Sequence, residues 1–281
     1  MYRTLISAAD LAAHLDDPSW VVVDVRYSLA DVGAGLAQYR ESHIPGAVYA
    51  SLSHDLASTP TGTNGRHPLP SPDAMAAAFG RLGIGPGTQV VCYDADNMFA
   101  ARLWWMLRFL GHDAVAVLDG GFPKWVSEGR PVRVGEEHRS AATFTPAVRE
   151  DMRVQVETVT AASQHGSLRL VDARAPERFE GKNETLDKAA GHIPGAANYF
   201  FKQNFTAEGT VRPAEELRTA LAAATAGKPM SEVVMYCGSG VTACQNLLAL
   251  EHAGLPGARL YVGSWSEWSA DPSRPVETGP G

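Results

Sequence analysis

Cys237 lies between a short apolar run, 233–236, and a loop of small residues, 238–242. The residues that follow, 243–253, have the composition of a helix, and Gly254 is a typical helix end. Backbone N–H groups of a tight loop, together with the positive end of a helix, favour a thiolate over a thiol. The order of strand, loop and helix therefore predicts that Cys237 is a nucleophile. We refer to residues 237–242 as the Cys237 loop.

The surrounding residues do not fit several other uses of a cysteine. A phosphatase loop of the form Cys-x5-Arg requires an arginine where this chain has Ala243. No Cys-x2-Cys pair offers zinc-ligand spacing, and no cysteine-protease signature surrounds the thiol. Cys92 and Cys244 are predicted to be buried and inert. Sulfur transfer through a persulfide on Cys237 is the chemistry that a compact loop of N–H donors suits.

An internal repeat supplies the elements that position this loop. The pattern Asp-x-Arg occurs at 24–26 and again 148 positions later, and His-Ile-Pro-Gly occurs at 43–46 and again 149 positions later. Apolar runs alternate with helical stretches in both copies, which predicts an α/β fold of two tandem domains, each a mostly parallel sheet flanked by helices. The clearest helices are expected at 74–82, 100–110, 213–226 and 243–253. The predicted organisation is a first domain over 1–138, a linker over 139–152 and a second domain over 153–281.

The two copies separate structural features from functional ones. The shared Asp-x-Arg and His-Ile-Pro-Gly patterns are predicted to fix turns and buried polar contacts. Cys237 is not shared, because Asp94 stands 143 positions earlier, so the first copy is predicted to be catalytically silent. Arg178 is also unshared, since its counterpart is Ala30. It follows the strand that carries Asp172, and the carboxyl ends of parallel strands share one edge of a sheet. We therefore expect Arg178 to bind the anionic part of a substrate.

Composition limits the class of partner. The chain has 281 residues, a formal net charge of −7 and three cysteines. This charge argues against nucleic acid or an anionic membrane as the main partner. The first residues lack the apolar core of a signal peptide, no apolar run is long enough to span a bilayer, and three cysteines do not make a disulfide framework. We expect a cytoplasmic protein that uses no cofactor and no metal.

Several motifs resemble those of a known family. They are Cys-Gly-Ser-Gly-Val-Thr at 237–242, Gly-His-Ile-Pro-Gly at 191–195, and the segments 118–125 and 263–268. Together they resemble the tandem rhodanese family of sulfurtransferases, over nearly the whole chain. The resemblance implies a silent first domain and an active second domain. It also implies a cysteine that takes sulfane sulfur from a small anionic donor and passes it to a thiol acceptor such as thioredoxin, or to cyanide.

The resemblance also implies roles for single residues. Arg178 matches the donor-binding arginine of the motif Asp-x-Arg-x3-Arg-Phe. Ser239 is implied to assist thiol deprotonation, with a histidine and an acid from the first domain. His67 matches that histidine, and Asp55 is the candidate for the acid, although the family's position falls near Ser53. The loop residues expected to contact the donor are Gly238, Gly240, Val241 and Thr242.

Two donors stay open at this point. The neutral sequence after Cys237 is similar to that of 3-mercaptopyruvate sulfurtransferases, whereas thiosulfate sulfurtransferases usually have basic residues there. The mercaptopyruvate type often has a second arginine before Gly-His-Ile-Pro-Gly, but residues 184–188 read Glu-Thr-Leu-Asp-Lys. Lys188 could substitute, as a point charge rather than a bidentate fork. We expect a 3-mercaptopyruvate sulfurtransferase, with a thiosulfate sulfurtransferase or a non-catalytic persulfide carrier as the alternatives.

Overall fold

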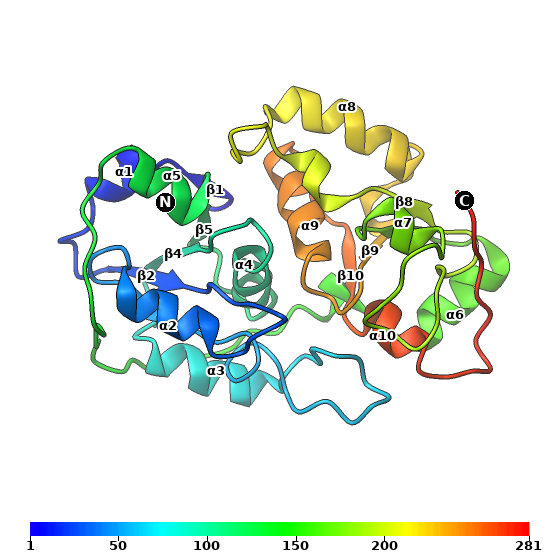
Figure 1. Cartoon of the computed structure of the whole chain (residues 1–281), viewed down its shortest axis with the longest axis horizontal. Coiled ribbons are helices and arrows are strands. Elements are labelled where there is room, and N and C mark those ends of the chain that lie inside the picture. The colour runs from blue at the N-terminus through cyan, green and yellow to red at the C-terminus, as the bar shows by residue number, and fades with distance from the viewer. Residues whose placement is uncertain (281) are drawn as a thin grey trace. The chain divides into compact units, whose positions relative to one another are not determined.

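The computed structural model describes residues 1–280 and divides them into two compact units (Figure 1). Unit 1 comprises Met1–Ser58, Pro70–Arg149 and Ala207–Val211. Unit 2 comprises Thr59–Leu69, Glu150–Thr206 and the chain from Arg212 onward. Each unit therefore consists mainly of one copy of the repeat and includes a short segment from the other copy.

Unit 1 is built on a five-stranded sheet with the order β1-β5-β4-β2-β3, in which every strand pair is parallel. Its strands are β1 (Leu5–Ile6), β2 (Trp20–Asp24), β3 (Val48–Tyr49), β4 (Gln89–Tyr93) and β5 (Val115–Leu118). Its helices are α1 (Ala8–Ala12), α2 (Ala34–Glu41), α3 (Pro72–Arg81), α4 (Ala100–Phe109) and α5 (Gly121–Ser127). Every residue of the central strand β4 is buried, as expected for a parallel strand covered on both faces.

Unit 2 repeats this topology with the strand order β6-β10-β9-β7-β8, again all parallel. Its strands are β6 (Arg153–Val154), β7 (Arg169–Asp172), β8 (Ala197–Asn198), β9 (Val233–Tyr236) and β10 (Arg259–Tyr261). Its α-helices are α6 (Val156–His165), α7 (Pro176–Phe179), α8 (Ala214–Thr225), α9 (Ala243–His252) and α10 (Ser264–Trp268). Short 3-10 turns occur at Glu150–Met152, Phe201–Asn204 and Met230–Glu232. The predicted α/β fold with two tandem parallel sheets is confirmed.

The core of unit 2 holds β9 and α9 in place. All four residues of β9 are buried, as are residues 243–250 of α9. Large aromatic side chains fill the space on one side of the sheet, among them Tyr236, Trp265 and Trp268. A strand and a helix that are buried on nearly every side have little freedom to move. The loop between them, which contains Cys237, is therefore mounted on rigid elements.

The shared Asp-x-Arg patterns form equivalent buried ion pairs. Arg174 donates to the carboxylate of Asp172 at 2.7–3.1 Å, and Arg26 donates to Asp24 in the same way at 2.6–3.1 Å. All four side chains are at most 5% exposed. Removing one partner of such a pair leaves a buried charge without compensation and costs about 3–5 kcal/mol. These residues are structural in both copies, in agreement with the prediction.

The shared histidines have a similar structural role. The ring of His192 stacks on Phe179 with 3.7 Å between centroids, and its Nδ1 lies 2.8 Å from the Phe179 carbonyl oxygen. His43 stacks on Tyr39 and lies at the same 2.8 Å from the Tyr39 carbonyl. Each histidine thus fixes the turn that follows it.

No helix among residues 1–280 is long and apolar enough to cross a membrane.

Candidate active site

The Cys237 loop is fixed at the carboxyl end of β9 by the start of α10. The Cys237 N–H donates to Ser264 Oγ at 3.1 Å, and the Cys237 carbonyl accepts from the Trp265 N–H at 2.9 Å. The next carbonyl, that of Gly238, accepts from the Ser266 N–H at 2.9 Å. Cys237 itself is only 1% exposed. The thiol is therefore held where the chain turns from strand to helix, as the sequence predicts.

Two glycines in the loop are close to neighbouring groups. Gly240 has φ of 73°, and a Cβ at this position would lie 2.3 Å from the Val262 carbonyl oxygen. A Cβ on Gly238 would lie 2.8 Å from Nη2 of Arg66 and 3.6 Å from Nη1 of Arg178. Gly240 is required by the backbone conformation and by packing. Gly238 marks the point where two guanidinium groups approach the residue next to the thiol.

Ser239, two residues after Cys237, forms a hydrogen-bonded pair with His67. His67 Nδ1 lies 2.8 Å from Ser239 Oγ, and the two residues are 8% and 6% exposed. His67 comes from the segment Thr59–Leu69, which belongs to unit 2. A hydroxyl bonded to an imidazole can pass a proton to it, so this pair has the arrangement of a proton relay. Val241, which is buried, and Thr242 complete the loop and lead into α9.

Arg178, on α7, is held by two carboxylates. Its Nε and Nη2 donate to Glu184 at 2.8–3.1 Å, and Nη2 also donates to Asp187 Oδ2 at 3.0 Å. The two acidic side chains are only 3% and 2% exposed, whereas the arginine side chain is 22% exposed. Burial acts to raise the pKa of Glu184, but the Leu186 N–H and the Arg178 guanidinium hold it below its usual value. Burial raises the pKa of Asp187 despite the charges of the guanidinium groups.

Arg66 is a member of this cluster that the sequence analysis missed. Its Nη1 forms an ion pair with Asp187 Oδ1, and its backbone N–H donates to Ser266 Oγ at 3.0 Å. The only available signal was its position directly before His67. Lys188, the predicted substitute for a second arginine, is exposed and forms no ion pair with the described residues 1–280. The structure therefore brings Arg66, not Lys188, to Arg178.

Asp55 has partners of its own within unit 1. Its carboxylate accepts from the Ser51 N–H at 2.8 Å and from Arg81 at 3.0 Å. The nearby Ser53 hydroxyl lies 3.3 Å from that of Ser51. Asp55 is thus engaged at the end of α3 and is not among the residues that unit 2 gathers around Cys237. Its proposed role as the acid next to His67 stays a prediction.

The other thiols and the twin position behave as structural residues. Cys92 and Cys244 are fully buried, and burial raises the pKa of Cys92. Asp94, the counterpart of Cys237, is 2% exposed, and its carboxylate accepts backbone N–H groups of Asn97, Phe99 and Ala100 at 2.6–2.8 Å. The backbone N–H groups of this loop in the first copy therefore bind the carboxylate of Asp94. No thiol occupies the position that corresponds to Cys237.

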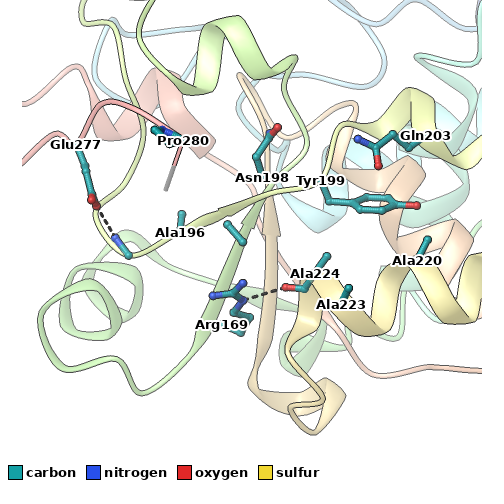
Figure 2. Close-up of a pocket in the computed structure, with 12 residues that line it drawn as sticks. Arg169, Ala196, Asn198, Tyr199, Gln203, Ala220, Ala223, Ala224, Glu277 and Pro280 are labelled. Atoms are coloured by element: carbon teal, nitrogen blue, oxygen red, sulfur yellow. Dashed lines mark hydrogen bonds between the residues drawn. The ribbon is translucent and has the colours of Figure 1, made fainter.

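A hollow in unit 2 lies along the edge strand β8 and encloses about 620 Å³ (Figure 2). Its two charged side chains are already engaged: Arg169 Nε donates to the Ala224 carbonyl at 2.9 Å, and Glu277 accepts from the Gly195 N–H at 2.9 Å. No thiol lines it. Cys237 therefore lies outside the lining of this hollow.

Comparison with known proteins agrees with the geometry. The model of the Rhodanese-like domain matches residues 7–128 and again residues 155–271. This chain belongs to the rhodanese family. The duplicated rhodanese domain accounts for the internal repeat, and the prediction of the family and of a sulfurtransferase is confirmed.

Curated rhodanese relatives match the chain from end to end. A protein named "Probable 3-mercaptopyruvate sulfurtransferase" from Pseudomonas aeruginosa is 44% identical over 98% of this chain and 98% of its own length. The "Putative thiosulfate sulfurtransferase SseB" of Mycobacterium tuberculosis is 39% identical over 99% and 98%. The crystal structure of SseA from Escherichia coli, a 3-mercaptopyruvate sulfotransferase by its title, is 32% identical with a TM-score of 0.81 and covers 95% of this chain and 100% of that one. Both donor types therefore occur among the relatives.

Proposed function

We propose that this rhodanese is a 3-mercaptopyruvate sulfurtransferase that carries sulfur as a persulfide on Cys237. The observation that carries the proposal is the approach of two guanidinium groups to Gly238, directly after the thiol. A donor bound there would place its carboxylate on the arginines and its sulfur near Cys237. The name of the Pseudomonas aeruginosa relative supports the same donor.

The first copy supports the idea that the loop stabilises an anionic sulfur. In that copy the carboxylate of Asp94 accepts three backbone N–H groups at 2.6–2.8 Å. The equivalent loop of the second copy lies between β9 and α9, which correspond to β4 and α4 of the first copy. Its N–H groups would converge on the side chain of Cys237 in the same way. They would hold a thiolate before transfer and a persulfide after it.

The proposed reaction has two halves. The thiolate of Cys237 attacks the donor sulfur, the S–S bond forms, and the C–S bond breaks so that pyruvate leaves as its enolate. The enolate then takes a proton at carbon. The Ser239–His67 pair would move that proton: it accepts the proton from a thiol before the attack and returns it to the leaving group. In the second half, a thiol or cyanide takes the outer sulfur, and the Cys237 thiolate is restored.

The charges around the donor site favour a monoanion. Arg66 and Arg178 carry two positive charges, and the buried Glu184 and Asp187 carry two negative charges. The cluster is thus formally neutral when both acids are ionised. A neutral cluster can hold one carboxylate through directed hydrogen bonds, but it lacks the excess positive charge that a dianion such as thiosulfate would require. Thiosulfate transfer stays the alternative, because one relative is named for it.

Mass spectrometry and pyruvate release test the proposal. The reduced protein is incubated with 3-mercaptopyruvate or with thiosulfate, and the gain of one sulfur atom is located by peptide mapping. We expect sulfur on Cys237, pyruvate released on turnover with a thiol, and faster loading from 3-mercaptopyruvate. Cys237→Ser should abolish loading without changing the melting temperature, whereas Cys244→Ala serves as the matched control and should still load. Faster loading from thiosulfate would reverse the donor assignment.

The acceptor is proposed only as a class. Loading of Cys237 without turnover by small thiols, thioredoxin or cyanide would indicate a persulfide carrier rather than an enzyme acting on small molecules. Among the described residues 1–280, none of the three cysteines forms a disulfide. A cytoplasmic, reducing location is part of the proposal, because the nucleophile must be regenerated as a thiolate after each transfer.

A further inference from the structure

The hollow along β8 is open because small side chains line it (Figure 2). Half of its lining residues are glycine or alanine: residues 195–197 next to β8, and Ala220, Ala223 and Ala224 on α8. Its volume of about 620 Å³ falls within the range of about 300–1,000 Å³ that ligand sites occupy. No residue of its lining takes part in the proposed sulfur transfer, so that reaction does not account for this space.

In unit 1 a segment of the chain covers the corresponding surface. Residues 137–142 form neither helix nor strand. The side chain of Glu137 accepts from the Gly46 N–H at 3.3 Å, and the arginine two residues later donates to the Pro18 carbonyl, just before β2, at 2.8 Å. The N–H of the last residue of the segment donates to the Gly80 carbonyl on α3 at 2.9 Å. The polar groups of this segment are thus bonded to other elements of unit 1, as in a docked extended peptide.

The hollow of unit 2 is the counterpart of this covered surface. Gly195 corresponds to Gly46 in the repeated His-Ile-Pro-Gly pattern, and Arg169 on β7 corresponds to Val21 on β2, 148 positions earlier. Helix α8 corresponds to α3, because each helix precedes the strand, β9 or β4, at the centre of its sheet. The space that residues 138–142 cover in unit 1 is therefore open in unit 2.

An arginine lies at the end of this helix in both units, but the two arginines come from different segments. In unit 1, Nε of Arg139 in the docked segment would lie 3.3 Å from a Cβ on Gly83, two residues after α3. In unit 2, Nε of Arg169 donates to the Ala224 carbonyl near the end of α8 at 2.9 Å, and this guanidinium forms no ion pair within residues 1–280. Its two Nη groups can therefore bind a carboxylate. A segment that docks here would gain from an acid where unit 1 has Arg139.

The edge of β8 adds backbone groups to this site. Strand β8 is last in the strand order and, among the described strands, pairs with β7 alone. The Tyr199 N–H donates to the Asp172 carbonyl at 2.9 Å, so the alternation of a strand points the backbone N–H and C=O of Asn198 away from β7. Unpaired groups at a sheet edge bind an extended peptide as an added strand. The hollow therefore offers both backbone hydrogen bonds and a guanidinium.

We propose that this hollow is a docking groove for an extended segment of a partner protein, whose acidic side chain pairs with Arg169 and whose backbone bonds to the edge of β8. The occupant is a polypeptide because its counterpart in unit 1 is a polypeptide, and the small lining residues leave room for a backbone. The inference goes beyond the proposed function, since no step of that reaction uses a residue of the hollow.

Fluorescence anisotropy with two labelled peptides tests the groove on the full chain. One peptide has the sequence of residues 138–145, which is the segment that unit 1 docks, and the other is its Arg139→Glu version. We expect the acidic peptide to bind about tenfold more tightly, which corresponds to about 1.4 kcal/mol. This preference should shrink as salt rises from about 0.05 M to about 0.5 M, because salt screens an ion pair that water reaches.

Variants of the lining locate the binding. Ala223→Phe places a ring in the hollow and should abolish binding of both peptides. Ala222→Phe is the matched control, because Ala222 is the neighbouring exposed alanine on α8 but does not line the hollow. Arg169→Gln should bring the two dissociation constants within about twofold of each other, and Arg169→Lys should keep part of the preference. Sulfur loading on Cys237 should match the wild type in Ala222→Phe and Ala223→Phe.

Several results would overturn the inference. It is wrong if neither peptide binds at about 1 mM, where the binding free energy is only about 4 kcal/mol, or if Ala223→Phe binds both peptides as well as Ala222→Phe does. Displacement of the acidic peptide by an equal concentration of free glutamate would indicate a site for small anions instead. A wild-type dimer that Ala223→Phe converts to a monomer in sedimentation would make a second copy of this chain the occupant.

The same experiments separate this inference from the proposed function. If Cys237 gains no sulfur from either donor but the acidic peptide binds and Ala223→Phe abolishes that binding, the groove stands and the proposed function is wrong. If Cys237 loads as expected and the peptides fail to bind, the proposed function stands and the groove is wrong.

Discussion

The hydrogen bond between Ser239 and His67 leads to a quantitative prediction. The two atoms are 2.8 Å apart, and both residues are at least nine-tenths buried. If the pair moves one proton as a unit, removing either member breaks the same relay. A positioned general base contributes about 10²–10⁴-fold to rate. We therefore expect Ser239→Ala and His67→Ala each to slow persulfide loading by about 100-fold or more.

The double variant gives the sharper test. For a relay, removing the second member costs nothing more, so the double variant should also be about 100-fold slower than wild type. The coupling energy is then about 2.7 kcal/mol, because each factor of ten is 1.36 kcal/mol. Two independent residues would instead give a loss of about 10⁴-fold and no coupling. Stability also changes, since a buried polar group that loses its partner costs about 1–3 kcal/mol.

Rapid-quench loading from 3-mercaptopyruvate, read by the mass of the Cys237 peptide, measures the rate directly. Urea unfolding of each variant separates lost stability from lost chemistry. Ser163→Ala is a matched control. Ser163 lies on α6, and its hydroxyl donates to the Pro194 carbonyl at 2.9 Å, so it has no part in the relay. Losses that multiply in the double variant would refute the relay.

Two further predictions concern stability. Gly240→Ala should lower the free energy of unfolding in urea by more than about 2 kcal/mol, because it combines φ of 73° with a clash against the Val262 carbonyl. The control is Gly166→Ala, which has a similar φ of 65° but no atom within 4 Å of its Cβ, and which should cost about 1 kcal/mol. Equal costs for the two variants would contradict the clash. Hydrogen bonds from Arg149 lower the pKa of Asp113, so this pair stabilises the fold above the usual aspartate pKa and loses its effect as pH falls through the lowered value. Asp113→Asn should cost less than about 1 kcal/mol near neutral pH and nothing in strong acid, and a cost that persists in acid would contradict it.

Local sequence signals were sufficient for the framework. Strand β9, the Cys237 loop and helix α9 follow one another without interruption, so apolar periodicity and loop composition locate Cys237 at the turn from strand to helix. The repeat extends this reading, because two copies of one pattern predict two sheets of the same topology. The predicted helix 74–82 was observed at Pro72–Arg81, and Ser71 caps it by accepting the Ala74 N–H. Such boundaries depend on neighbours that are close in the sequence.

The cluster of Arg66, Arg178, Glu184 and Asp187 could not be predicted in the same way. Arg66 and Asp187 are 121 positions apart, and neither has a pattern that identifies its partner. The sequence offered Lys188 as the nearest cation, yet the structure leaves its side chain exposed and brings in Arg66 instead. His67 was found only through its resemblance to a motif. Contacts made by long polar side chains depend on where the backbone comes together, which a linear pattern does not encode.

The assignment of Thr59–Leu69 to unit 2 has a consequence for how the chain can be divided. The first repeat has Asp94 where the second has Cys237, yet its segment with Arg66 and His67 packs within the unit that holds Cys237. A gene cut between the repeats would therefore yield a second half that retains Cys237 but lacks Arg66 and His67.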